Sequence, residues 1–161
     1  MISHVGFHND EFIAAGMEIA LAAAEKAWRE HGDVPVGAVI LDPRGAVIAT
    51  GVNKRELDRD PTAHAEIVAI REAGALLENW RLDGCTLVVT LEPCAMCAGA
   101  ILQSRITRLV FGAWDEKAGA VGSVVDLVRD PRALTKVEVI TGVFAERSSA
   151  LLKEFFATTR S

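Results

Sequence analysis

His64-Ala65-Glu66 and, further along, Pro93-Cys94-Ala95-Met96-Cys97 are the two stretches that the fold of this chain must bring together. One imidazole and two thiols can fill three corners of a zinc tetrahedron and leave the fourth open, as catalytic zinc requires. The carboxylate of Glu66, two residues from His64, can then transfer protons beside the metal. The sequence therefore predicts a catalytic zinc held by His64, Cys94 and Cys97, with Glu66 as the acid–base group.

Both stretches are predicted to begin helices. Thr62 can cap a helix from Ala63 to about Leu77, and Pro93 suits the start of a helix that ends near Ser104. Thiols at a helix N-terminus have lowered pKa values, which favours the thiolates that bind metals. Residues two apart on a helix point about 200° from each other, so Glu66 is expected to shuttle protons rather than to be a fourth ligand.

Plainer interpretations of the same residues compete with a catalytic zinc. Cys94 and Cys97 could form a redox pair, and His64 taken alone could be an ordinary core histidine. A structural zinc would need four protein ligands, and the sequence offers no obvious fourth. Pro93 and Glu66 beside the three ligands favour the catalytic interpretation.

Length and composition are those of a small globular enzyme. The 161 residues are 50% hydrophobic and 24% charged, which predicts one domain spanning residues 1–161. We see no signal peptide and no apolar run approaching the roughly 18 residues of a membrane span, so we expect a cytoplasmic protein. Three cysteines, an odd number, argue against a disulfide framework, and Cys85 is expected to be a buried thiol.

The net charge and the local charge clusters point in opposite directions on whether the partner is a nucleic acid. A net charge of −5 argues against nucleic acid, because phosphate binding normally leaves a basic surface. Basic residues nevertheless cluster within Lys54–Arg59, Arg129–Lys136 and Arg147–Arg160. Each cluster is either a phosphate contact or ordinary solvated surface charge.

The rest of the chain alternates strands and helices. Apolar residues at helical spacing predict a long helix, capped by Asn9 or Asp10 and ended by Gly32 after His31. Strands are predicted over Val36–Leu41, Ala46–Val52, Thr86–Thr90, Arg108–Phe111 and Lys136–Thr141, and a closing helix over Arg147–Thr159. The first two strands form a hairpin around a turn at residues 42–45. This order predicts an α/β sandwich around a mixed sheet.

Longer motifs connect the chain with a known family. The most specific are Pro61-Thr62-Ala63-His64-Ala65-Glu66 and Leu91-Glu92-Pro93-Cys94-Ala95-Met96-Cys97-Ala98-Gly99. Further markers are Val34–Ala38, Ser104–Ile106, Phe111–Ala113 and Gly119–Ser123. On these residues the chain resembles the cytidine deaminase-like superfamily and, more closely, the bacterial tRNA-specific adenosine deaminases (the TadA family). The resemblance covers nearly the whole chain.

The resemblance implies a fold, a cofactor and a reaction. The fold is a three-layer α/β/α sandwich with a five-stranded mixed sheet, acting as a homodimer with one Zn²⁺ per subunit. The reaction converts adenosine at the wobble position of a tRNA anticodon to inosine (A34 to I34) and releases ammonia. On this hypothesis zinc activates water for attack on C6 of a flipped-out adenine. Glu66 takes up a proton, returns it to N1 and then assists departure of ammonia.

The resemblance also implies contacts with the anticodon loop. Asn53 corresponds to an asparagine that contacts the target nucleoside, and Asp115 and Lys117 to a loop that holds the preceding nucleotide. Phe156 and Arg160 correspond to a C-terminal phenylalanine and arginine near the anticodon loop. Plainer roles exist: Asn53 could close a turn, Asp115 could cap one, and Phe156 could belong to the core.

Two positions depart from the family pattern. Trp114 stands in a variable loop position that often carries arginine, and Leu134-Thr135-Lys136 stands where Asn-His-Arg is common. An amide and an imidazole that could contact RNA are missing there. The change leaves the catalytic centre untouched and bears on the detail of anticodon recognition.

Two other functions stay open on the sequence. A deaminase of a free base or nucleoside, such as guanine or cytosine, would use the same zinc chemistry, and the acidic net charge favours it slightly. The match of Asn53, Asp115, Phe156 and Arg160 favours tRNA more strongly. A non-enzymatic RNA-binding module with a structural zinc would have no use for Glu66.

Overall fold

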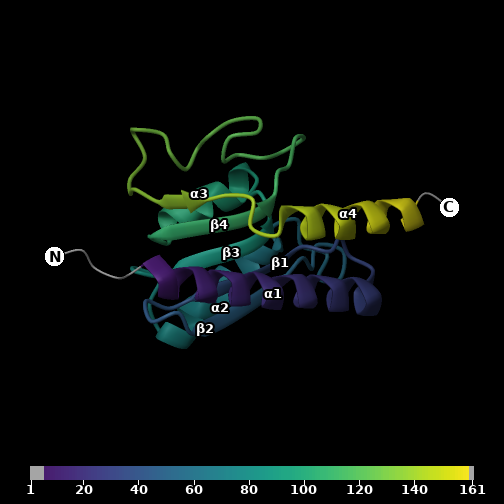
Figure 1. Cartoon of the computed structure of the whole chain (residues 1–161), viewed down its shortest axis with the longest axis horizontal. Coiled ribbons are helices and arrows are strands. Elements are labelled where there is room, and N and C mark those ends of the chain that lie inside the picture. The colour runs from purple at the N-terminus through teal and green to yellow at the C-terminus, as the bar shows by residue number, and fades with distance from the viewer. Residues whose placement is uncertain (1–5, 160–161) are drawn as a thin grey trace.

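A five-stranded sheet forms the middle layer of the molecule (Figure 1). The computed structural model describes residues 6–159, with side chains from Asp10 onward. The strands are β1 (Gly37–Leu41), β2 (Val47–Val52), β3 (Thr86–Leu91), β4 (Arg108–Ala113) and β5 (Glu138–Ile140). The helices are α1 (Gly6–His31), α2 (Ala65–Leu77), α3 (Ala95–Gln103) and α4 (Ala145–Thr159). This arrangement confirms the predicted α/β sandwich.

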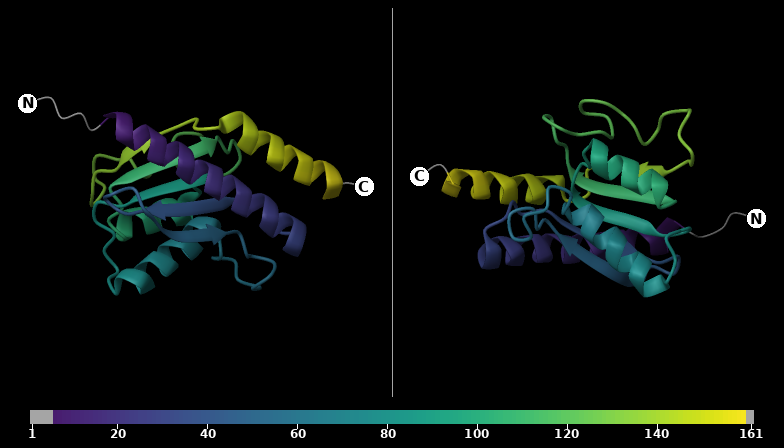
Figure 2. Two further views of the ribbon diagram at one scale, coloured as in Figure 1. Left: turned by 60° about the horizontal axis from the view of Figure 1, so that its bottom comes forward. Right: turned by 180° about the vertical axis from the view of Figure 1, so that it is seen from behind.

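Helices cover both faces of the sheet, with α1 and α4 on one side and α2 and α3 on the other (Figure 2). Successive side chains of a strand point to opposite faces, and β1 supplies both cores for that reason. Val39 belongs to the core cluster that contains Met17 of α1, whereas Ile40 belongs to the cluster that contains Ile101 of α3. Central strands covered on both faces need continuous apolar sequence, and every residue of β1 is buried.

Strand directions place several loop segments at one edge of the sheet. The strands lie in the order β2-β1-β3-β4-β5, with β1 antiparallel to both β2 and β3, and β3 parallel to β4. The carboxyl ends of β2, β3 and β4 therefore share an edge with the amino end of β1. In open α/β sheets, ligands bind outside the carboxyl ends of the strands. The segments that follow Val52, Leu91 and Ala113 are thus brought together.

Predicted strands and turns agree with the structure to within a few residues. The hairpin of β1 and β2 forms with antiparallel pairing, and Gly45 in its turn adopts a positive φ of 89°, which glycine tolerates at little cost. Gly32 ends α1 with a φ of 77°. β5 is shorter than predicted, and α4 begins two residues earlier, at Ala145.

Three predicted helix starts are wrong. Asn9 and Asp10 lie inside α1, which begins at Gly6. A polar residue can lie in a helix when it faces solvent, and Asp10 is exposed. Thr62 does not cap α2, because its N–H and hydroxyl both donate to the Asp60 carboxylate, at 2.8 and 2.7 Å.

The third correction concerns α3, which begins at Ala95 instead of Pro93. Pro93 precedes the helix and accepts a hydrogen bond at its carbonyl from the N–H of Ala120, at 2.8 Å.

Elsewhere in the fold, Cys85 is a buried thiol just before β3, as predicted. Among the described residues, no helix has the length and apolar character of a membrane span.

We expect the contact between β2 and α2 to be intolerant of added volume. A Cβ at Gly51 would overlap the backbone of Ala65 and Ala69 in α2. Gly51→Ala should therefore lower the free energy of unfolding by about 1–3 kcal/mol, the usual cost of overpacking. Denaturant unfolding measures this change.

Gly74→Ala is the matched control within α2, because a Cβ there meets only Asn79 O, at 3.5 Å. It should be neutral or stabilise by up to about 1 kcal/mol, since alanine is the better helix former. Equal effects at the two glycines would contradict the described packing.

Candidate metal centre and active site

The three predicted metal ligands meet where two helices begin. His64 is the N-cap of α2, Cys94 is the N-cap of α3, and Cys97 lies in the first turn of α3. His64 Nδ1 is 3.5 Å from the Sγ atoms of both Cys94 and Cys97. One ligand atom from each of the three residues lies within 4.8 Å of the others. The structure thus brings together the whole predicted ligand set.

These distances fit a zinc ion. Zinc–sulfur bonds of about 2.3 Å and zinc–nitrogen bonds of about 2.0 Å, at tetrahedral angles, separate nitrogen from sulfur by about 3.5 Å. The His64 nitrogen lies at that distance from each sulfur. Among the described residues, the potential metal-binding cluster contains His64, Cys94 and Cys97 and no fourth histidine, cysteine or carboxylate. This donor set suits catalytic zinc, which keeps one position free of protein ligands.

Electrostatics at the cluster also favour a cation. A hydrogen bond from the Cys97 thiol is the main cause that lowers the pKa of Cys94, to about 3. The same contact, together with burial, raises the pKa of Cys97. The hydrogen bond with Cys94 raises the pKa of His64, although burial opposes it. Two sulfurs this close carry two negative charges only when a cation lies between them.

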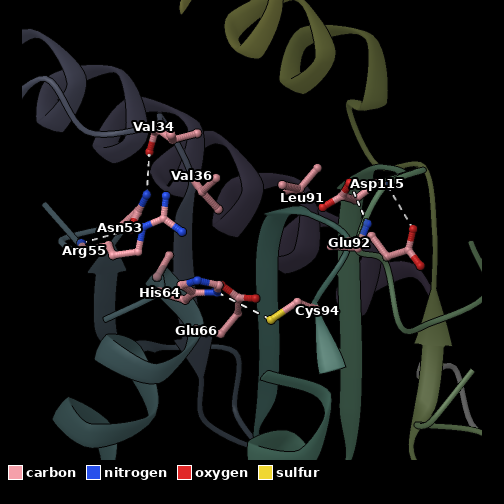
Figure 3. Close-up of a pocket in the computed structure, with 12 residues that line it drawn as sticks. Val34, Val36, Asn53, Arg55, His64, Glu66, Leu91, Glu92, Cys94 and Asp115 are labelled. Atoms are coloured by element: carbon pink, nitrogen blue, oxygen red, sulfur yellow. Dashed lines mark hydrogen bonds between the residues drawn. The ribbon is translucent and has the colours of Figure 1, made fainter. Parts of the chain in front are cut away.

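Glu66 lies beside this cluster in a buried position. It is only 4% exposed, and Figure 3 shows its carboxylate next to the His64 ring and facing Cys94. Burial raises the pKa of Glu66, although nearby hydrogen-bond donors and His64 partly oppose the shift. The angular argument from the sequence does not hold as stated, because His64 has extended backbone angles (φ −70°, ψ 154°) outside the helix.

A cavity of about 230 Å³ opens in front of the metal cluster (Figure 3). Its walls come from the sheet edge where the strand ends meet, as the topology requires. The lining includes Val34, Val36, Asn53, Arg55, His64, Glu66, Leu91, Glu92, Cys94 and Asp115. The cavity thus joins a metal cluster, a buried acid and several polar groups in one space.

Asn53 lines this cavity and also closes the turn after β2. Its Nδ2 donates to the carbonyl of Val34 at 3.4 Å, and its Oδ1 accepts from the N–H of Arg55 at 3.1 Å (Figure 3). Both contacts fix the orientation of the amide. The turn-closing role weighed from the sequence is therefore real, and it holds the side chain at the cavity wall.

Asp115 also combines a local role with a place in the cavity wall. Its Oδ1 accepts from the N–H groups of Lys117 and Ala118, at 3.1 and 3.3 Å, and so caps a turn. Its own N–H donates to Glu92 Oε1 at 2.9 Å. Lys117 is exposed and is not among the residues that line the cavity.

The C-terminal residues lie on α4 and outside the cavity lining. Phe156 is 47% exposed and packs edge-on against Phe155, so it is not a core residue. Phe155 takes the core position and packs against Trp28 of α1. Arg160 lies outside the described residues.

The two departures from the family pattern are both at the surface. Trp114 is 48% exposed and rests edge-on against Phe111, with ring centroids 4.9 Å apart. Leu134 is 68% exposed. Neither residue is among those that line the cavity.

The basic clusters separate into two kinds. Arg129, Arg132 and Arg147 pair with the carboxylates of Asp126, Asp130 and Glu18 respectively. These pairings favour the interpretation of ordinary surface charge for the two later clusters. Arg55 differs, because it lines the cavity.

Sequence reasoning missed two residues at this site. It treated Arg55 only as part of a charged cluster, and it gave no role to Glu92, which is 2% exposed. The position of Glu92 directly after an apolar strand, two residues before a ligand, was the available signal. A carboxylate there must be buried and therefore needs partners.

Comparison with known proteins identifies the family. The model of the cytidine and deoxycytidylate deaminase zinc-binding region matches residues 10–113. The chain is 49% identical over 150 residues to the tRNA-specific adenosine deaminase of Haemophilus influenzae, covering 93% of this chain and 86% of that protein.

Solved structures agree with this match. A chain from a study of A-to-I editing by tRNA:A34 deaminases at the wobble position of transfer RNA has a TM-score of 0.81 and 44% identity, covering 86% of this chain and 99% of that one. The guanine deaminase of Nitrosomonas europaea has a TM-score of 0.69 and 30% identity, covering 90% and 82%. The chain therefore belongs to the tRNA-specific adenosine deaminases, within the proteins that share the cytidine and deoxycytidylate deaminase zinc-binding region.

Proposed function

We propose that this protein is a zinc-dependent hydrolase that converts adenosine 34, at the wobble position of a tRNA anticodon, to inosine and ammonia. The observation that carries the proposal is the arrangement of His64, Cys94 and Cys97 around one point, with buried Glu66 beside it at the base of a cavity. The 49% identity to a tRNA-specific adenosine deaminase supports the choice of substrate.

Glu66 carries the proton transfers in the proposed reaction. Zinc held by His64, Cys94 and Cys97 would supply the Lewis acidity that makes water nucleophilic near neutral pH. Water adds to C6 of adenine, and Glu66 accepts one of its protons and delivers it to N1. Glu66 then takes the proton of the new C6 hydroxyl and transfers it to the C6 amino group, so that the C6–N bond breaks, ammonia leaves and the C6 carbonyl of inosine forms. Burial raises the pKa of Glu66, which favours uptake of a proton compared with an ordinary carboxylate and so suits this double role.

Asn53 and Asp115 are proposed to hold the nucleotides at the cavity. One N–H of the Asn53 amide is already bound to Val34, and the second N–H is a donor that the target nucleoside can use. Asp115 presents a carboxylate that can accept hydrogen bonds from the ribose or base of the preceding nucleotide. The turn contacts of both side chains keep them preorganised, which lowers the entropic cost of binding.

Lys117, Phe156 and Arg160 are proposed to contact the anticodon loop outside the cavity. The exposure of Lys117 and Phe156 leaves both side chains accessible to RNA. An exposed phenyl ring can stack on an unpaired base, and a lysine can contact a phosphate. A basic contact of this kind would offset part of the acidic net charge.

We also propose that the protein acts as a homodimer. Several large apolar side chains are exposed, and burying them would stabilise an association. They are Leu76, Trp80, Val124, Val125 and Leu134.

We also propose a cytoplasmic location, as expected from the sequence, because it agrees with a tRNA substrate.

Free guanine is the main competing substrate, because the chain also resembles a guanine deaminase in sequence and structure. An anticodon stem-loop panel with adenosine at position 34, tested beside free adenosine, guanine and cytosine, separates the two functions. We expect inosine in at least one stem-loop, with turnover lost on zinc chelation and restored by zinc. Turnover of free guanine without any RNA product would contradict the proposal.

Replacing Glu66 tests the proton-transfer step. Glu66→Gln should keep stoichiometric zinc and lose turnover by a factor of about 10² to 10⁴ or more, because the amide cannot exchange a proton. Single-turnover deamination and metal analysis measure the two properties. Glu72→Gln is the matched control, since Glu72 is exposed on the same helix. Near-normal turnover by Glu66→Gln would show that another group moves the proton.

Replacing Asp115 tests the RNA contact. Asp115→Ala should raise KM for the stem-loop about tenfold, the cost of a hydrogen bond to a charged group. Asp115→Asn keeps an oxygen that can cap the turn at Lys117 and should lose less. Steady-state kinetics on the stem-loop measure both variants. Unchanged KM and rate in Asp115→Ala would remove this residue from the binding site.

A further inference from the structure

Glu92 is a buried carboxylate that the proposed chemistry does not use. It follows β3 directly, lies two residues before the ligand Cys94, and is 2% exposed. Its Oε1 accepts from the N–H of Asp115, and its Oε2 accepts from the N–H groups of Val121 and Ser123, at 2.9, 3.0 and 3.1 Å. The Ser123 hydroxyl also donates to Oε1. Among the described residues, the groups that donate to Glu92 are therefore three backbone N–H groups and one hydroxyl, and none of these groups carries a charge.

All these donors belong to one segment, residues 114–123, which we call the β4 loop. This loop leaves the carboxyl end of β4, and β4 pairs in parallel with β3. Two backbone hydrogen bonds join the same segment to the end of β4 and to the loop: Glu92 N–H donates to Ala113 O, and Ala120 N–H donates to Pro93 O, both at 2.8 Å. The segment that carries Cys94 is thus joined by several hydrogen bonds to the loop that carries Asp115, and Figure 3 shows Glu92 beside Asp115.

Gly119 shows how closely the two segments fit. A Cβ at this position would overlap the Glu92 carboxylate, and Gly119 also forms an isolated β-bridge with Cys94. The carboxylate occupies the space that any larger residue at position 119 would need. The β4 loop is therefore built around the Glu92 side chain.

From these contacts we infer that Glu92 is a positioning residue for RNA binding: it holds the β4 loop, and so Asp115, at a fixed place relative to the metal ligands. The inference rests on the proposed function, since Asp115 matters only if it contacts the substrate. A displacement of about 1 Å at such a residue can cost a large factor in activity. Glu92 acts through Asp115 and is not itself a catalytic residue.

Only a carboxylate satisfies this arrangement. Four donors converge on two oxygens that both accept, and an ionised carboxylate has only acceptors. Glutamine has almost the same shape but replaces one oxygen by an NH₂ group, which would face at least one backbone N–H donor in either orientation. A donor facing a buried donor leaves both unsatisfied, which is costly. The β4 loop should then shift while the side chain still fills its space.

Glu92→Gln is therefore the test variant, and Glu116→Gln, exposed on the same loop, controls for the loss of one charge. We expect Glu92→Gln to keep one zinc per chain and to raise KM for an anticodon stem-loop by up to about tenfold, the full loss expected for Asp115→Ala. Its kcat should stay within about threefold of the wild type, because the metal ligands and Glu66 are unchanged. Glu116→Gln should match the wild type in both constants.

A double-mutant cycle with Asp115→Ala tests the route of the effect. If Glu92 acts through Asp115, adding Glu92→Gln to Asp115→Ala should raise KM by less than about twofold further. Wild-type turnover of the stem-loop in the same assay shows whether the proposed function itself holds. Should Glu92→Gln not fold, Ser123→Ala replaces it in the same cycle, with an expected rise in KM of about fivefold for one lost hydroxyl bond.

Three results would overturn the inference while leaving the proposed function intact. The first is an unchanged KM in the folded test variant. The second is a loss of zinc or of kcat with KM unchanged, which would make Glu92 a support of the metal site alone. The third is full additivity with Asp115→Ala.

Discussion

The site depends on one constraint: two helix N-termini must meet at the carboxyl edge of the sheet. The start of α2 supplies His64 and the start of α3 supplies the two cysteines, and the His64 nitrogen lies 3.5 Å from each cysteine sulfur. The sheet enforces this meeting, because β2, β3 and β4 all end at that edge. The partial positive charge of a helix N-terminus further favours thiolates there.

Two buried glutamates at this edge have opposite environments. Burial dominates at Glu66 and raises its pKa, which suits a group that takes up and releases protons. Burial also acts to raise the pKa of Glu92, but hydrogen bonds from Ser123, Asp115 and Val121 outweigh it and lower the pKa. A carboxylate held ionised by backbone donors is suited to fixing a loop. On the proposed function, the same type of side chain serves chemistry at one position and geometry at the other.

Much of this fold and site could be predicted from the sequence, because it depends on local pattern. Apolar runs and turn residues predicted all five strands, and the His and Cys spacing predicted the ligand set. Helix starts were harder, since Thr62 is bound to Asp60 and is not free to cap α2. The role of Glu92 could not be predicted, because its partners are three backbone N–H groups and one hydroxyl, 23 to 31 residues further along the chain, whose approach depends on strand pairing.

X-ray absorption at the zinc edge of the purified protein tests the central claim most directly. The account predicts one zinc per chain with two sulfur neighbours and a single imidazole, the set offered by His64, Cys94 and Cys97. A third sulfur, a second imidazole, or protein that binds no stoichiometric zinc would contradict it.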